Sequence, residues 1–458
     1  MGKCQNKVRT RVDAELDSSI KKRYGLFIGS RCTGACNPRI VDRSESKLST
    51  ICPTQRFYFN STLEMSFLKS PDWRLHPERM YPELHETRVL PVDGIWHLSR
   101  YADVAALLNH PKVTNVQPGA SGDAPLHESM LQKDPPHHGR IRSTVGPQLN
   151  KQPVQQFRER FHLSAESLFE DLRPGFKMDF MSGIAEKLPI LSMSAMFFLD
   201  KKDIEKISGY VADYVHRSES NKPQLEIWAE QNQDLLRIRE LFRETIQNRA
   251  DDPPKEADVL DMLLQAEATQ TLSHAEVLEM CVILTLGGIE TTPNLLGSAM
   301  ALLHLNPVVR GQIQSTPSLI PALIEEVLRL ESPVKHSSPR TALVDINING
   351  LQVPKGTSLI GLFGAANRDP EAFDRPDALE LNRKGKPHLG FGYGIHYCVG
   401  AHFARLQAQI ILEMMFQKIP NWRVSPIGLW QQIRGKSDIE WKPNPTFRGL
   451  QQLQLEWN

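Results

Sequence analysis

The sequence has few cysteines and no long apolar run. Only 6 of its 458 residues are cysteine, and four of these lie within the first 52 residues, unlike the dense, regular cysteine framework of a small secreted protein. No stretch of about 18 or more apolar residues occurs, and the first residues, MGKCQNKVRTRVDAELDSS, lack the apolar core of a secretory signal. We therefore expect a protein of the reducing cytoplasm with no membrane anchor.

The sequence also has no excess of charge of either sign. Its 54 basic residues are balanced by 53 acidic ones, for a formal net charge of +1, so no bulk attraction favours nucleic acid or an anionic membrane as a partner. Repeats and low-complexity tracts are not found. The length is sufficient for about three average domains, although large single domains are common.

The N-terminal segment differs in composition from the rest. Residues 1–64 carry 12 Lys and Arg against 6 Asp and Glu and show no sustained hydrophobic period. A regular sequence pattern begins at Met65. We interpret Met65 as a candidate natural start and residues 1–64 as a structureless upstream extension. The basic composition is a weak match to an organelle-targeting arm, and Cys32 and Cys36 without a second pair make a poor zinc site.

The remaining chain reads as mostly helical with a small β portion. Apolar residues recur at three- and four-residue spacing between residues 155 and 306, and a short helix ends before Pro111. Short alternating runs with turns at Asn349-Gly350 and Pro354-Lys355-Gly356 predict strands over 339–362. A helical pattern of apolar residues follows Cys398 and ends at Pro420.

One cysteine lies in a glycine-rich loop, in the stretch GFGYGIHYCVGA over residues 390–401. Glycines let backbone N–H groups converge on a nearby atom. A helix that begins near Val399 would direct its positive dipole end at the sulfur of Cys398. We expect this to lower the thiol pKa and favour the thiolate, which is the form that binds a metal.

A second candidate site lies in the middle of a long helix. Ser273 and Glu276 form a capping box, from which helical text continues to Pro307. Its middle holds poor helix formers, and the proline among them removes a hydrogen bond, so we expect a locally opened turn; the residues are Gly287, Gly288, Thr291, Thr292 and Pro293. Such a turn, with Glu290 beside it, offers room for a flat cofactor and a proton route. The alternative interpretations are a kinked core helix or a membrane helix.

These segments together resemble the cytochrome P450 family. Residues 391–400 match its pattern Phe-Gly-x-Gly-x-His-x-Cys-x-Gly, and residues 287–292 resemble its Ala/Gly-Gly-x-Asp/Glu-Thr-Thr/Ser segment. The resemblance implies that Cys398 is the proximal thiolate ligand of haem b (iron protoporphyrin IX). It also implies roles for residues around the haem: Phe391 beside the sulfur, His396 near a propionate, Gly287 and Gly400 against the cofactor, and Glu290 with Thr291 as proton donors.

Further segments follow the family pattern. Glu326 and Arg329 would be an everyday surface pair if taken alone, but the resemblance implies a buried lock on the haem-binding core. His138 and Arg142, on one helix face, and Arg340 resemble the family's propionate-binding cations. The segment Pro376-Asp-Ala-Leu-Glu380 departs from the family and lacks an arginine that commonly joins the lock, so we expect the lock to be incomplete.

The resemblance covers about residues 66–454 and implies one large, mainly α P450 domain over 65–458. It implies a monooxygenase that inserts one oxygen atom of O2 into a small, mostly apolar substrate, while the other atom leaves as water. No flavin or iron–sulfur domain fits after Cys398, so electrons would come from a ferredoxin and its NAD(P)H-dependent reductase. We expect a monomer.

Two alternatives remain open at this point. A peroxide-driven P450 would leave Glu290 and Thr291 superfluous, and a haem-binding sensor or carrier would need Cys398 but no electron donor. The substrate itself is not predicted beyond a lipid-like, terpenoid, polyketide or peptide class. We expect Ile283, Leu286, Val334 and His336 to face it, under a lid formed by residues 115–130 and 195–235.

Overall fold

The computed structural model describes residues 70–116, 124–197, 199–220, 222, 224–251, 258–425 and 439–458. By its contacts, the chain divides into Met1–Phe67 and Leu68–Asn458, and every described residue belongs to the second unit. The predicted extension over residues 1–64, the candidate start Met65 and the Cys32/Cys36 pair therefore lie outside the described residues.

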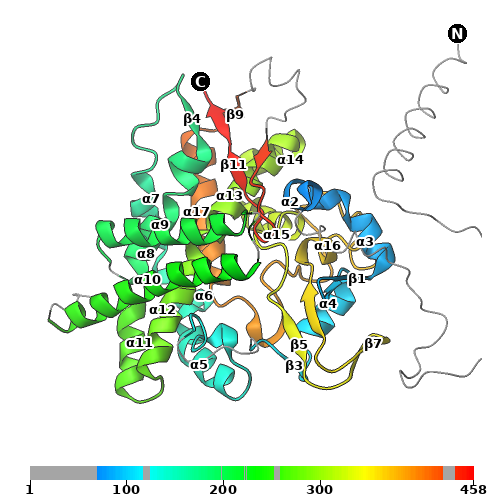
Figure 1. Ribbon diagram of the computed structural model, residues 1–458. Helices are drawn as coiled ribbons and strands as arrows, with labels where there is room; N and C mark the ends of the chain where they lie inside the picture. Colours follow the sequence, from blue (N-terminus) through cyan, green and yellow to red (C-terminus); the bar gives the residue numbers. More distant parts are fainter. Residues whose placement is uncertain are drawn as a thin grey trace, which may run out of the picture. The chain divides into compact units, whose positions relative to one another are not determined.

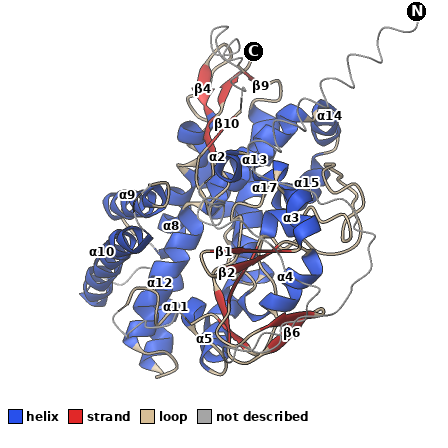
Figure 2. Ribbon diagram, turned by 45° about the vertical axis from the view of Figure 1, so that its right-hand side comes forward, coloured by secondary structure: helices blue, strands red, loops and turns tan. Residues whose placement is uncertain are grey.

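Helices make up most of the described chain (Figure 2). The first group comprises α2 (Pro71–Leu75), α3 (Tyr81–Thr87), α4 (Tyr101–Leu108), α5 (His137–Val145), α6 (Lys151–Gln156), α7 (Arg158–Glu166) and α8 (Leu188–Phe197). The second comprises α9 (Lys201–Arg217), α10 (Gln224–Asp251), α11 (Val259–Ala268), α12 (His274–Ile289), α13 (Thr291–Leu305), α14 (Pro307–Ser315), α15 (Ile320–Leu330), α16 (Phe363–Ala366) and α17 (Ala401–Lys418). None of the described helices is long and apolar enough to cross a bilayer.

The strands are short and form small sheets. A five-stranded sheet has the order β1-β2-β8-β5-β3, in which only β2 and β8 are parallel; its strands are β1 (Val89–Val92), β2 (Ile95–Leu98), β3 (Val113–Thr114), β5 (Arg340–Ala342) and β8 (Ser358–Gly361). The smaller sheets are antiparallel and pair β6 (Ile346–Ile348) with β7 (Leu351–Val353), β10 (Glu440–Trp441) with β11 (Leu450–Gln452), and β12 (Gln454–Glu456) with β4 (Lys177–Asp179) and β9 (Arg423–Val424).

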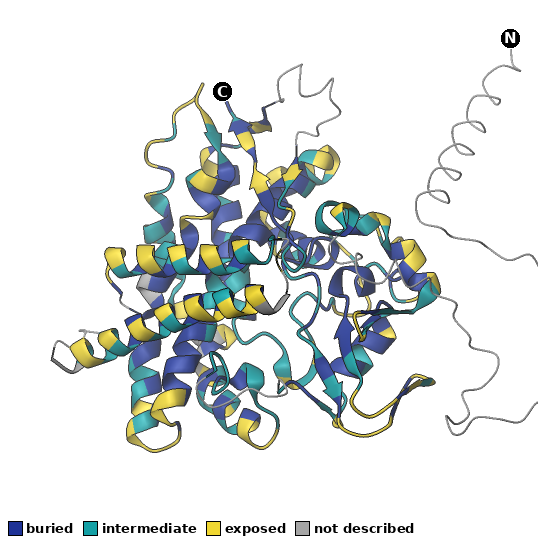
Figure 3. Ribbon diagram, viewed as in Figure 1, coloured by how far each residue is buried: buried dark blue, intermediate teal, exposed yellow. Residues whose placement is uncertain are grey.

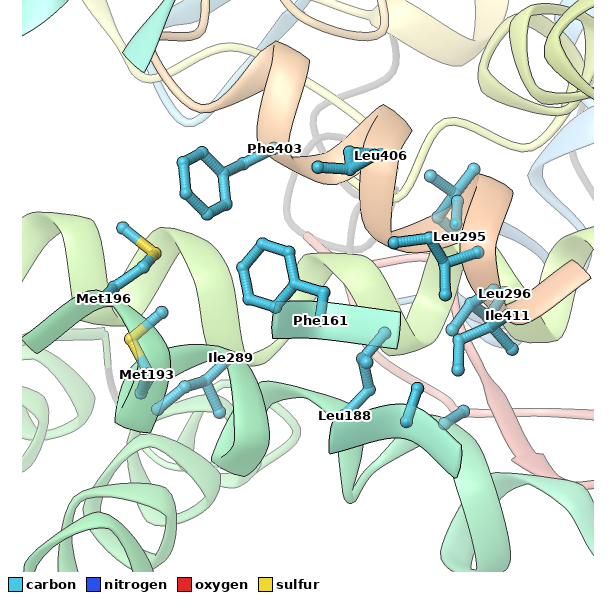
Figure 4. Close-up of a cluster of buried hydrophobic side chains, with 14 of the residues drawn as sticks. Phe161, Leu188, Met193, Met196, Ile289, Leu295, Leu296, Phe403, Leu406 and Ile411 are labelled. Atoms are coloured by element: carbon cyan, nitrogen blue, oxygen red, sulfur yellow. The ribbon is translucent and has the colours of Figure 1, made fainter. Parts of the chain in front are cut away.

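Helices and the main sheet occupy different sides of the described unit. In Figure 1, α7 to α13 and α17 gather on the left, while β1, β3 and β5 lie on the right with α3 and α4. Figure 3 shows α10 exposed along its outer side and the central helices buried. The helical side has a continuous apolar core, part of which Figure 4 shows, with Phe161 from α7, Leu188 from α8, Leu295 from α13, and Phe403 and Ile411 from α17.

The predicted elements of the central helix are confirmed. Ser273 Oγ accepts from the Glu276 backbone N–H at 3.2 Å and the Glu276 carboxylate accepts from the Ser273 N–H at 2.8 Å, so the capping box is complete. The helix is interrupted at Glu290, where α12 ends and α13 begins. The break lies three residues before Pro293, which lacks the N–H that an uninterrupted helix needs.

The β portion is confirmed as well. Strands β5 to β8 fall within residues 339–362, and the turn between β6 and β7 places Asn349 and Gly350 at φ values of 48° and 88°. Both values lie in the left-handed region that Asn and Gly adopt most easily, which is the requirement of a tight two-residue hairpin.

The buried pair on α15 has a third member that the sequence interpretation missed. Arg329 donates to Glu326 at 2.8 and 2.9 Å, and both side chains are almost fully buried. Arg383 also donates to both Glu326 oxygens at 3.1 Å, and the backbone N–H of Glu380 donates to one of them at 3.0 Å. The expectation of an incomplete lock was therefore wrong, because an arginine further along the chain reaches the same carboxylate.

Arg383→Ala is expected to lower the free energy of unfolding by about 2–4 kcal/mol, because it leaves part of a buried carboxylate charge uncompensated. Urea unfolding followed by circular dichroism measures this. Arg375→Ala is the matched control, since the Arg375 side chain is 70% exposed and its removal should change the midpoint little. Equal midpoints for the two variants would contradict the assignment of Arg383 to the lock.

Candidate active site

The loop around Cys398 is shaped by its glycines. Gly392 and Gly394 have φ values of 74° and 72°, which other residues adopt at a cost. A Cβ on Gly390 would lie 2.7 Å from the carbonyl oxygen of Leu328, so this glycine permits close approach to α15. The Cys398 N–H donates to the Phe391 carbonyl at 2.8 Å, which closes the loop upon itself.

The predicted lowering of the Cys398 pKa was wrong, because the pKa of this thiol is raised in the structure. Helix α17 begins at Ala401, with Gly400 as its cap, slightly later than predicted. The Gly400 N–H, Arg142 and Arg405 do lower the pKa of the thiol, but burial outweighs them and raises it above its ordinary value. A metal that coordinates the sulfur would displace this proton, because metal binding and thiol deprotonation are coupled.

The loop is held against α15 by charged contacts. Arg405 donates to the Glu325 carboxylate at 2.7 and 2.9 Å and lies over the ring of Phe391 at 4.6 Å from its centroid. His388 lies 3.2 Å from the same carboxylate. These partners lower the pKa of Glu325 to about 2, so the carboxylate stays charged under ordinary conditions and fixes both ends of the loop.

Four predicted cationic residues meet beside this loop, although they are distant in sequence. We call His138 and Arg142 of α5, Arg340 of β5 and His396 the cationic cluster. The rings of His138 and His396 lie 4.4 Å apart, and Arg142 donates to the Tyr397 carbonyl at 2.7 Å. Three other nitrogens of the cluster, Nε2 of both histidines and Nε of Arg340, are buried without a hydrogen-bond partner.

The cluster is electrostatically unbalanced. Burial and, to a smaller extent, the charges of Arg340, His138 and Arg142 lower the pKa of His396 to about 3. Burial likewise lowers the pKa of Arg340 to about 10, against the opposing charge of Asp134. Buried polar nitrogens without partners are rare in proteins and usually indicate an absent ligand or water. An anionic group placed here would satisfy them.

The central helix has an open face, formed by Ile283, Leu286, Gly287 and Thr291, although most of its other residues are buried. A Cβ on Gly287 would meet no atom within 4 Å, whereas one on Gly288 would lie 3.0 Å from Met193. The two glycines therefore serve different purposes. Gly287 borders open space, and Gly288 allows α8 to pack closely.

The acid and the alcohol at the helix break are held by hydrogen bonds. The Thr291 hydroxyl donates to the Gly287 carbonyl at 2.6 Å, in the manner of a back-bonded helical threonine. Glu290 accepts from Asn294 Nδ2 at 3.0 Å and lies 3.8 Å from Lys442 Nζ. Burial raises the pKa of Glu290, with Lys442 and Asn294 opposing the shift, so it keeps its proton to a higher pH than an exposed glutamate does.

The predicted substrate-facing residues after α15 alternate in exposure. Val334 and His336 are half-buried, while Lys335 and Ser337 between and after them are buried. Burial lowers the pKa of His336 to about 4, and its Nδ1 lies 2.9 Å from the Ser337 carbonyl. His336 is therefore a neutral imidazole that donates from Nδ1. Residues 117–123 of the predicted lid lie outside the described residues.

Comparisons with known proteins agree with this geometry. The family model "Cytochrome P450" matches residues 317–427. Cytochrome P450 109 of Bacillus spizizenii is 30% identical over 401 residues, which are 86% of this chain and 95% of that protein. The chain belongs to the cytochrome P450 family. As a member, it is an oxidoreductase of the monooxygenase class with a haem-thiolate cofactor.

Two further P450s extend the comparison. The cytochrome P450 monooxygenase PikC of Streptomyces venezuelae is 28% identical over 384 residues, 81% of this chain and 88% of PikC. Among solved structures, the myxobacterial CYP267B1 in complex with myristic acid has a TM-score of 0.75 at 28% identity and covers 85% of this chain and 98% of its own. The helical fold with small sheets is therefore that of a P450.

The residues of this P450 fit a haem group. Haem carries two propionate carboxylates, and the cationic cluster presents buried nitrogens that lack an anionic partner. Gly287 and Gly400 both border open space, since a Cβ on either would meet no atom within 4 Å. Arg142 connects the two features, because its charge acts on both His396 and the Cys398 thiol.

Gly287→Leu is expected to preserve folding but to reduce haem uptake at least about tenfold, because the added side chain occupies the open space while leucine is a better helix former than glycine. Circular dichroism of the haem-free chain and haem titration by absorbance test the two parts. Gly209→Leu in α9, where a Cβ also meets no atom within 4 Å, is the control that should bind haem normally. Unimpaired uptake by both variants would contradict the placement of haem at Gly287.

Proposed function

We propose that this P450 binds haem b through the Cys398 sulfur and inserts one oxygen atom of O2 into a small, mostly apolar substrate. The observation that carries the proposal is the cationic cluster beside Cys398, whose buried nitrogens lack protein partners. The fold combines a thiol that can ligate a metal, a cluster that can bind an anion and an open helix face. Together these features suit a flat, dianionic group that carries a metal.

The protein residues have distinct tasks in this proposal. Cys398 would ligate the iron, and the cationic cluster would hold the propionates. Haem, when bound, supplies the reductive activation of O2 and the oxidation of the substrate. Phe391 and Arg405 hold the Cys398 loop in place through their mutual contact, which keeps the sulfur in position.

Proton supply falls to Glu290 and Thr291. Burial raises the pKa of Glu290, which favours its protonated form, and its contact with Lys442 leads toward Glu186, 3.6 Å from the same ammonium group. Thr291 lies at the helix break, with its hydroxyl oxygen on the open face. The hydroxyl would pass a proton toward a group bound on that face. In the absence of such a transfer, it donates to the Gly287 carbonyl.

The substrate class follows from the residues on the open face and from the relatives. Ile283, Leu286 and Val334 offer apolar contact, and His336 adds one neutral polar group. CYP267B1 was solved with myristic acid, and the relative PksS of Bacillus subtilis is named for polyketide biosynthesis. We therefore propose a lipid-like or polyketide-like compound of secondary metabolism, with electrons from a ferredoxin and its reductase, in a cytoplasmic monomer.

Cys398→Ala is expected to abolish the long-wavelength absorbance band of the reduced CO complex that gives the family its name, because that band requires a thiolate ligand to the iron. The difference spectrum of reduced protein with and without CO measures it. Cys281→Ala is the matched control, since Cys281 is also a free cysteine but lies fully buried in α12. A band that survives in Cys398→Ala would remove Cys398 as the ligand.

Thr291→Ala is expected to retain substrate binding and electron consumption but to divert most electrons to hydrogen peroxide, with a loss of product of about 10² to 10⁴-fold. Product and peroxide formed per NAD(P)H consumed, with a ferredoxin system, give the coupling. Thr245→Ala in α10 is the control, because Thr245 makes the same back-bond, to Leu241 at 2.9 Å. Unchanged coupling in Thr291→Ala would favour the peroxide-driven alternative.

A further inference from the structure

A buried carboxylate of the central helix contacts two other segments of the chain. Glu279 belongs to α12 and its side chain is only 4% exposed. It forms an ion pair with Arg239 of α10. It also accepts a hydrogen bond of 2.5 Å from the backbone N–H of Leu126, in the segment that leads from β3 to α5.

Glu279 lies on the side of α12 that bears the open face. Residues four, seven and eleven positions apart share one side of a helix, so Ile283, Leu286 and Glu290 follow Glu279 along the same stripe. Ile283 and Leu286 are half-buried, whereas Glu279 is buried beneath its two partners. The ion pair therefore closes the N-terminal end of the stripe that we assign to the substrate side.

The segment that Glu279 holds has a strained residue at the point of contact. Leu126 has a φ of 65°, a conformation that costs a leucine free energy unless its surroundings impose it. Its carbonyl accepts from the buried Ser129 hydroxyl at 2.7 Å. Charge-assisted bonds to a carboxylate are among the stronger hydrogen bonds in proteins. Contacts on both sides of Leu126 thus maintain this backbone turn.

The same segment is fixed at its other end by Asp134, which accepts from the Thr114 hydroxyl at 2.5 Å and from the Asn115 N–H at 3.3 Å. Helix α5, with His138 and Arg142, follows directly. Because Asp134 holds the end near the cationic cluster, loss of the Glu279 contact would release residues 124–129 without displacing α5.

We propose that Glu279 is a positioning residue that clamps residues 124–129 and α10 onto α12 and thereby controls the access of bulky ligands to the open face. This rests on the proposed function, in which that face is the substrate side. Removing the carboxylate removes a contact of both segments at once, since Arg239 and Leu126 share it. Small ligands are not affected, because they need no such opening.

Hydrogen exchange on the haem-loaded full chain tests the clamp directly. In Glu279→Ala, peptides covering 124–130 and 236–243 should lose about 10- to 100-fold of their protection, the factor expected for a lost charged hydrogen bond. Glu279→Gln should keep the protection of 124–130, since its amide oxygen still accepts from Leu126, but loosen 236–243. The buried α17 peptide 406–416 is the reference for global stability.

Glu276→Ala is the matched control. Glu276 is also a buried acid of α12 paired with an arginine, but it bonds to Arg140 and Ser273 and not to Arg239 or Leu126. It should lower stability without exposing 124–130. Wild-type protection of 124–130 in Glu279→Ala, or an equal loss in Glu276→Ala or in peptide 406–416, would overturn the proposal.

A second experiment measures ligand access. It follows the absorbance change that occurs when 4-phenylimidazole or the smaller imidazole binds the ferric haem. In Glu279→Ala, the association rate of 4-phenylimidazole should rise in proportion to the lost protection, because only the open fraction admits it, and that of imidazole should not change. Equal acceleration of both would overturn control by size. A wild-type chain that takes up no haem would refute the proposed function, and the same hydrogen-exchange comparison on the haem-free full chain would then decide the clamp alone.

Discussion

Two adjacent carboxylates of α15 hold together the segments that make the site. Glu326 receives Arg329 and Arg383, and thereby ties α15 to the loop that precedes the Cys398 region. Glu325 receives Arg405 and His388, which lie on either side of Cys398. Glu326 is buried, and a buried carboxylate is stable only with partners that compensate its lost hydration. The position of Cys398 therefore depends on ion pairs between α15 and the segments before and after the cysteine.

The cationic cluster shows the opposite condition, a set of buried nitrogens without hydrogen-bond partners. The folding free energy of the chain keeps His138, His396 and Arg340 together, although burial and the neighbouring charges lower the pKa of His396 to about 3. Such a cluster is less costly once an anionic ligand occupies it. We therefore expect haem binding to raise the free energy of unfolding of the chain.

The central helix combines rigidity with an interruption. Its N-terminal half is fixed by the capping box and by Glu276 and Glu279, each paired with an arginine of a neighbouring helix. Its middle is opened by Pro293 and lined by Gly287, where no side chain fills the adjacent space. A break within an otherwise anchored helix gives Glu290 and Thr291 defined positions and leaves the face beside them accessible.

The sequence by itself determined the elements and most of the site. The capping box, the break at Glu290 and the strands of residues 339–362 follow from local backbone chemistry, which depends on residues close in the chain. The family pattern named Cys398 and the cationic cluster residue by residue. Only the tertiary structure decided that Arg383 completes the lock, that burial raises the pKa of Cys398 and that Glu279 reaches Leu126 and Arg239, because burial and long-range pairing depend on which distant segments meet in space.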